Sequence, residues 1–139
     1  MMSKPVNVYA HKGYGFEVVH EDEAWRVGLM NWCAQYSPDQ ITAMQRHENC
    51  DEVFVLLKGR CALLTLQESG IEMVDLQPDK VYNVHKGVWH NHVLDAQALV
   101  LVVENRDMDL ATSPYLDLDE VQRKQVERAL AKLDWTVQS

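Results

Sequence analysis

Two short polar stretches hold the side chains that could do chemistry. In "QRHENCDEVFVLLKGR", residues 45–60, His47 and Glu52 stand five positions apart at the start of an apolar run. In "HKGVWHNHV", His90 and His92 are two positions apart, which places them on one face of a strand. Imidazole nitrogens and a carboxylate can bind a divalent metal ion, and the same groups can move protons in catalysis. The spacing therefore predicts a site that combines these two stretches.

Short strands are the elements that must position these side chains. Segments rich in branched and aromatic residues alternate with turn residues such as "SPD", "ESG" and "QPD", which predicts an all-β sandwich or barrel. The predicted strands cover residues 15–19, 24–36, 41–47, 52–59, 60–67, 71–76, 80–85, 88–94 and 98–105. Several of them are apolar on both faces, so we expect the second face to be covered by another sheet, a helix or a second subunit.

A different periodicity marks the end of the chain. Apolar residues recur at helical spacing between residues 117 and 133, and Asp117 with Glu120 resembles a capping box. We therefore predict one C-terminal helix that packs on the β-domain. The predicted organisation is a β-barrel domain over residues 1–112 and this helical segment over residues 113–139.

The sequence resembles the cupin superfamily at two motifs. His47, four residues, Glu52, six residues and Gly59 match the first cupin motif, at 45–59. Gly87, two residues and His90 match part of the second motif, at 79–94. Two independent motifs agree in order and spacing. The resemblance implies a double-stranded β-helix, that is, a cupin jelly roll, here with one C-terminal helix.

This sequence departs from the cupin pattern at four motif positions. Gln45 stands where the first metal-binding histidine is expected, and Asp79, His85 and Leu94 replace the glycine, proline and asparagine of the second motif. The resemblance then implies a metal site of His47, Glu52 and His90, with Gln45 as a weaker fourth ligand. Two imidazoles and a carboxylate suit Zn, Fe, Mn or Ni and leave positions open for substrate.

The function implied by the resemblance is chemistry on a small polar metabolite, such as a sugar acid or another carboxylate. Isomerase, lyase and dioxygenase reactions all use a site of this kind, and His92 and Tyr82 are candidates for proton transfer. One alternative is a non-catalytic cupin that binds a small molecule. Another is a metal-free, epimerase-like cupin, which the intact set of two histidines and one glutamate disfavours.

Composition limits the partners and the compartment. The chain has 139 residues and a net charge of −8, and it carries no basic patch for nucleic acid or an anionic membrane. No apolar run is long enough to span a bilayer, and the N-terminal residues lack the apolar stretch of a secretory signal. The three cysteines form no disulfide or zinc pattern. We expect a cytoplasmic protein, and the strands that are apolar on both faces favour a homodimer.

Overall fold

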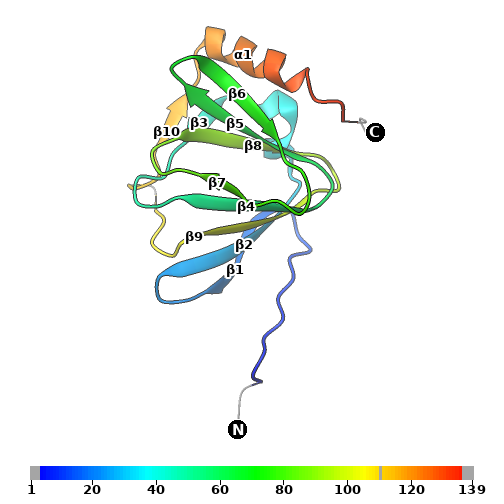
Figure 1. The fold of residues 1–139 in the computed structure, drawn as a ribbon, viewed down its shortest axis with the longest axis vertical. Coiled ribbons are helices and arrows are strands. Elements are labelled where there is room, and N and C mark those ends of the chain that lie inside the picture. The colour runs from blue at the N-terminus through cyan, green and yellow to red at the C-terminus, as the bar shows by residue number, and fades with distance from the viewer. Residues whose placement is uncertain (1–3, 110, 136–139) are drawn as a thin grey trace.

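The computed structural model describes residues 4–109 and 111–135, which form two five-stranded antiparallel sheets and one helix (Figure 1). The first sheet contains, in spatial order, β1 (Gly15–Glu21), β2 (Trp25–Asn31), β9 (Leu99–Asn105), β4 (Glu52–Lys58) and β7 (Tyr82–Val84). The second sheet contains β10 (Tyr115–Asp117), β3 (Ala43–Gln45), β8 (Trp89–Leu94), β5 (Cys61–Gln67) and β6 (Gly70–Asp75). Helix α1 (Glu120–Leu130) follows.

The main hydrophobic core lies between the two sheets. Alternate residues of each strand point inward, as the two-residue period of a strand requires. From the first sheet come Phe54, Leu56, Val100 and Val102, all nearly inaccessible to solvent. Cys61, Leu63 and Leu94 of the second sheet face them. Burial of these apolar side chains holds the two sheets together.

A second core forms between the outer face of the second sheet and α1. Leu64 and Val93 point away from the barrel and contact the apolar side of the helix, including Val126 and Ala129. Figure 1 shows α1 lying across this sheet. The predicted C-terminal helix is present, and its packing on this sheet explains why these strands are apolar on both faces.

The outer face of the first sheet has no such cover among the described residues. Val27 of β2, Leu101 of β9 and Val55 of β4 share this face through the strand register and remain partly exposed. Beside them, the described N-terminal residues run away from the barrel, and Val6 and Val8 are 71% and 90% exposed. The apolar outer positions of these strands are thus only partly buried within the described chain.

Several boundaries differ from those predicted. The predicted strand over 24–36 is β2 followed by a short 3₁₀ turn at Ala34–Tyr36, and the strand over 41–47 shrinks to Ala43–Gln45. Strand β10 was not predicted.

The helix also begins later than predicted. The capping box uses Asp119 and Gln122 rather than Asp117 and Glu120, and the last helical residue is Leu130 rather than residue 133. Asp117 instead ends β10, because its backbone pairs with Ala43 of β3. The last four residues of the predicted 113–139 segment lie outside the described chain.

Candidate metal centre

The three predicted ligands come from opposite sheets and meet inside the barrel. His90 lies on β8, where it is in register with Gln45 of β3, and His47 follows two residues after β3 ends. Glu52 is the first residue of β4 in the facing sheet. The backbone carbonyl of His47 accepts a hydrogen bond from the Gly87 N–H at 2.8 Å, so the turn before β8 holds this part of the chain in place.

The side chains of His47, Glu52 and His90, called the triad below, form a compact buried cluster. Their potential ligand atoms all lie within 4.8 Å of one another, and each residue is less than 10% exposed. Both histidines point Nε2 at the same carboxylate oxygen, Glu52 Oε1, at 3.3 Å for His47 and 2.9 Å for His90. Two imidazoles thus converge on one oxygen atom.

Hydrogen bonds to the other ring nitrogens hold both imidazoles in this orientation. His90 Nδ1 donates to the carbonyl of Val88 at 2.9 Å, and His47 Nδ1 is hydrogen-bonded to Ser113 Oγ at 2.8 Å. Because a carbonyl oxygen only accepts, His90 carries its proton on Nδ1, and in the neutral ring its Nε2 lone pair faces Glu52. Ring orientation by a partner on the far nitrogen is typical of metal-ligating histidines.

The contact between His90 Nε2 and Glu52 favours a positive charge between the two groups. Burial raises the pKa of Glu52, but hydrogen bonds to His47 and His90 outweigh this effect, so that its pKa lies well below the usual range. An ionised carboxylate that faces an imidazole lone pair is repulsive unless a proton or a metal cation lies between them. Two neutral imidazoles and one carboxylate are a common ligand set for a divalent transition metal, so the residues fit such an ion.

Gln45 lies beside the triad, and the nitrogen of its side-chain amide is already hydrogen-bonded. Its Nε2 donates to the backbone carbonyl of Ser113 at 3.0 Å. The amide oxygen is therefore the atom that Gln45 offers to the cavity. This arrangement is compatible with the predicted role of a weak fourth ligand.

A second buried carboxyl group, Glu104, adjoins the triad and was missed by the sequence analysis. Its Oε1 accepts hydrogen bonds from Nε and Nη2 of Arg26 at 3.1 and 2.9 Å, and the residue is 6% exposed. Burial and contact with Glu52 raise the pKa of Glu104 to about 8, although Arg26 opposes the shift. Glu104 occupies the inward-facing position of β9 that follows Val100 and Val102. An acidic residue at an inward-facing position of an apolar strand is the sequence signal that could have identified this second carboxyl group.

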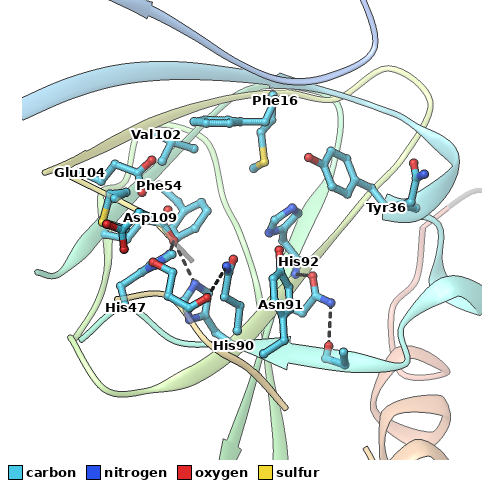
Figure 2. A pocket seen from close by; sticks show the side chains of 18 of the residues that line it. Phe16, Tyr36, His47, Phe54, His90, Asn91, His92, Val102, Glu104 and Asp109 are labelled. Atoms are coloured by element: carbon cyan, nitrogen blue, oxygen red, sulfur yellow. Dashed lines mark hydrogen bonds and ion pairs between the residues drawn. The ribbon is translucent and has the colours of Figure 1, made fainter. Parts of the chain in front are cut away.

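The triad forms one end of a cavity of about 610 Å³, and the other end is lined by aromatic rings (Figure 2). Phe16, Tyr36 and His92 line this second end, where the His92 and Tyr36 rings meet edge to face at 4.6 Å. Phe54 lies between the two ends, with its ring centroid 6.2 Å from those of both His90 and His92. Burial lowers the pKa of His92 to about 4 and raises that of Tyr36 to about 12, so both side chains are neutral near pH 7. The cavity therefore offers a charged end and an uncharged, ring-lined end.

Tyr82 is not among the residues that line this cavity. It pairs with Phe54 between β7 and β4, and its hydroxyl accepts a hydrogen bond from the Gln77 backbone N–H at 2.9 Å. Its ring packs against the main core. The position of Tyr82 therefore gives no support to the predicted proton-transfer role, whereas His92 does line the cavity.

Comparison with known proteins adds one family and a set of shared folds. A protein-family model described as auxin binding protein matches residues 4–112. None of the curated proteins compared with this chain matches its sequence. No helix of the described residues is long and apolar enough to cross a membrane.

Three solved structures illustrate the shared fold. A cupin-2 domain containing protein from Shewanella frigidimarina is 18% identical, with a TM-score of 0.53 over 70% of this chain and 85% of its own. The Streptomyces protein PAC13, solved with uridine, is 9% identical, with a TM-score of 0.58 over 89% of this chain and 98% of its own. Oxalate decarboxylase from Bacillus subtilis is 16% identical, with a TM-score of 0.50 over 69% of this chain and 24% of its own. The two sheets thus form the predicted double-stranded β-helix.

Proposed function

The chain belongs to the auxin binding protein family of the cupin superfamily, and we propose that it binds a divalent metal ion at the triad and acts on a small polar carboxylate. One observation carries this proposal. Two imidazole nitrogens converge on one ionised carboxylate oxygen inside a cavity, while hydrogen bonds on the far side of each ring fix its orientation. Zn, Fe, Mn and Ni all suit this donor set.

When bound there, the metal would supply Lewis-acid chemistry, polarising an oxygen atom of the substrate. His47, Glu52 and His90 would hold it as three protein ligands, with the Gln45 amide oxygen as a weaker fourth, and the remaining positions would face the cavity. Positive charge from the bound metal would favour an anionic substrate, which supports a sugar acid or another carboxylate.

The neutral end of the cavity would orient the rest of the substrate and exclude water from it. His92 is the cavity residue that we propose contacts the substrate, and the proton-transfer role predicted from the sequence stays with His92 rather than with Tyr82. The reaction type that we propose is an isomerisation, a lyase reaction or a dioxygenation, since sites of this kind support all three.

A non-catalytic binding protein is the second candidate, and the ring-lined end of the cavity favours it. Phe16, Tyr36 and Phe54 would accept the apolar part of a small organic acid, such as an auxin, while its carboxylate lies at the triad. The description of the matching family, auxin binding protein, points the same way. Saturable binding of an acid without turnover by the Zn, Fe, Mn or Ni form would favour this candidate over an enzyme.

We also propose that the protein is a cytoplasmic homodimer. The apolar outer face of the first sheet, with Leu101 at its centre, would be buried against the same face of a second copy. The three free cysteines suit a reducing compartment. Light scattering should give a dimer mass for wild type and a monomer mass for Leu101→Lys; a monomeric wild type would contradict the proposal.

The metal content of the purified protein tests the proposal that the triad binds a divalent metal ion. Wild type purified from metal-supplemented medium should contain a divalent metal, and His47→Ala and His90→Ala should lose it. His85→Ala is the matched control, because the side chain of this histidine is 78% exposed outside the cavity. Metal at 100 times its dissociation constant should stabilise the fold by about 2.7 kcal/mol. The proposal would be refuted if wild type contained no metal and its melting temperature were unchanged by chelators.

A further inference from the structure

The hydroxyl group of Tyr36 reaches into the cavity at the end away from the triad. Tyr36 belongs to the short 3₁₀ turn Ala34–Tyr36 that follows β2, and its side chain lines the cavity. Figure 2 shows the hydroxyl oxygen at the inner tip of this side chain, with His92 between it and His90. A polar group is therefore held at the ring-lined end, beside Phe16 and His92.

The packing around Tyr36 fixes the position of this hydroxyl. Its ring meets the His92 ring edge to face, with 4.6 Å between the centroids, and the backbone N–H of Phe16 interacts with the hydroxyl oxygen. Because an N–H can only donate, the hydroxyl keeps its own proton for another acceptor. Within residues 4–109 and 111–135, no side chain or carbonyl accepts that proton. A molecule in the cavity can supply the missing acceptor.

Tyr36 keeps its proton over the physiological range of pH. Burial is the main reason that the pKa of Tyr36 is raised to about 12, and the nearby charge of Glu52 adds to the shift. The hydroxyl is therefore a neutral donor at pH 7. It suits an uncharged acceptor, such as a carbonyl or hydroxyl oxygen, because a second carboxylate would lose its hydration among the rings at this end.

The middle of the cavity is apolar. The ring centroid of Phe54 lies 6.2 Å from those of both His90 and His92, and Met30 and Val102 of the main core also line the cavity. A ligand that contacts both ends thus needs a carboxylate, an apolar middle and a remote oxygen atom. The cavity volume of about 610 Å³ is in the range of pockets that hold small organic molecules.

We propose that Tyr36 determines substrate specificity: its hydroxyl donates a hydrogen bond to a carbonyl or hydroxyl oxygen of the substrate, at the end remote from the carboxylate that lies at the triad. This inference rests on the proposed function and narrows its substrate class to acids with an apolar middle and a second, uncharged oxygen. An acid with a methyl group in place of that oxygen leaves the Tyr36 hydroxyl without a partner and should bind more weakly.

Two pairs of acids with matched shapes test this role in the Zn(II)-loaded protein. Calorimetric titration would compare para-acetylbenzoate with para-isopropylbenzoate, and levulinate with isocaproate. Each pair exchanges a carbonyl oxygen for a methyl group, and in the para-substituted ring this oxygen cannot reach the metal that binds the carboxylate. Wild type should bind the keto acid of at least one pair roughly three- to tenfold more tightly.

Tyr36→Phe removes the hydroxyl and keeps the ring. This variant should bind Zn(II) as tightly as wild type, and its preference for the keto acid should fall to about twofold or less. Tyr82→Phe is the matched control, because the Tyr82 hydroxyl accepts from the Gln77 N–H and does not line the cavity. The control should keep the wild-type preference.

The possible outcomes distinguish this inference from the proposed metal site. If wild type binds Zn(II) but prefers the keto acid in neither pair, or binds none of the four acids, the inference is wrong while the metal site stands. If Tyr36→Phe keeps the wild-type preference, another group makes the selection and the inference is again wrong. If wild type binds no Zn(II), both the proposed function and the inference fail.

A measurement on wild type covers the case in which Tyr36→Phe does not fold. In Zn(II)-loaded protein with tyrosine labelled with ¹³C at Cζ, para-acetylbenzoate should shift the Tyr36 resonance more than para-isopropylbenzoate does. Both acids carry the same ring, so the difference reports the hydrogen bond to the keto oxygen. Equal shifts would overturn the assignment of Tyr36 as the contact for the remote oxygen.

Discussion

Replacing Ser113 with alanine should weaken metal binding without removing a ligand. Ser113 is 3% exposed, and its hydroxyl is hydrogen-bonded to His47 Nδ1 at 2.8 Å, on the far side of the ring from Glu52. Loss of such an orienting partner typically costs 10- to 100-fold in metal affinity, or about 1.4–2.7 kcal/mol. The backbone carbonyl of Ser113, which accepts from Gln45, is unchanged by the substitution. The effect should therefore come through His47.

Competition with a chromophoric chelator for Zn(II) measures this affinity directly. Ser113→Thr keeps the hydroxyl and should retain most of the affinity. Ser37→Ala is the matched control, because it removes a hydroxyl that accepts from Trp32 Nε1 at 3.2 Å, and neither residue lines the cavity. Thermal unfolding of each metal-free variant confirms that it is folded. The reasoning is refuted if folded Ser113→Ala binds Zn(II) within twofold of wild type.

Three further predictions follow from the geometry of the cavity. Gln45→His should tighten metal binding, because Gln45 is in register with the proposed ligand His90; unchanged affinity would place position 45 outside the coordination shell. Gly28→Ala should destabilise the fold by about 1–3 kcal/mol in urea unfolding, because the added Cβ would lie 2.1 Å from Cε2 of Phe16; an unchanged midpoint would contradict the close approach. In metal-free protein, the pKa of His92 is lowered to about 4. Below its ordinary pKa, the His92 side chain therefore takes up a proton when the protein unfolds. Stability due to His92 should thus fall by roughly 3 kcal/mol as pH drops from 6.5 to 4, and His92→Gln should flatten that slope; an identical slope would refute this.

The strands and the pairing of His47 with Glu52 could be predicted because they depend on local patterns. A short apolar run bounded by turn residues identified β4, and the fixed spacing of His47, Glu52 and Gly59 is retained in the fold. Gly59 adopts a positive φ of 65°, and a Cβ there would lie 2.6 Å from the backbone of Ala98. Glycine is required at this turn, which is why it recurs at a fixed place in the motif.

Boundaries were less predictable where two local solutions compete. Asp117 and Asp119 are both possible N-cap residues, and each has a residue three positions on that could complete a capping box. Tertiary pairing decided between them, because the backbone of Asp117 is used by β10 in its ladder with Ala43 of β3. Helix α1 therefore begins after Asp119.

The sequence by itself determined the fold class and the three triad residues, because strand alternation and motif spacing act over a few neighbouring positions. The tertiary structure alone decided what surrounds the triad. Ser113 reaches His47 across 66 positions of chain, and Arg26 reaches Glu104 across 78. Contacts over such separations leave no local periodicity, so the orientation of His47 and the position of the second carboxyl group are set only when the two sheets pack against one another.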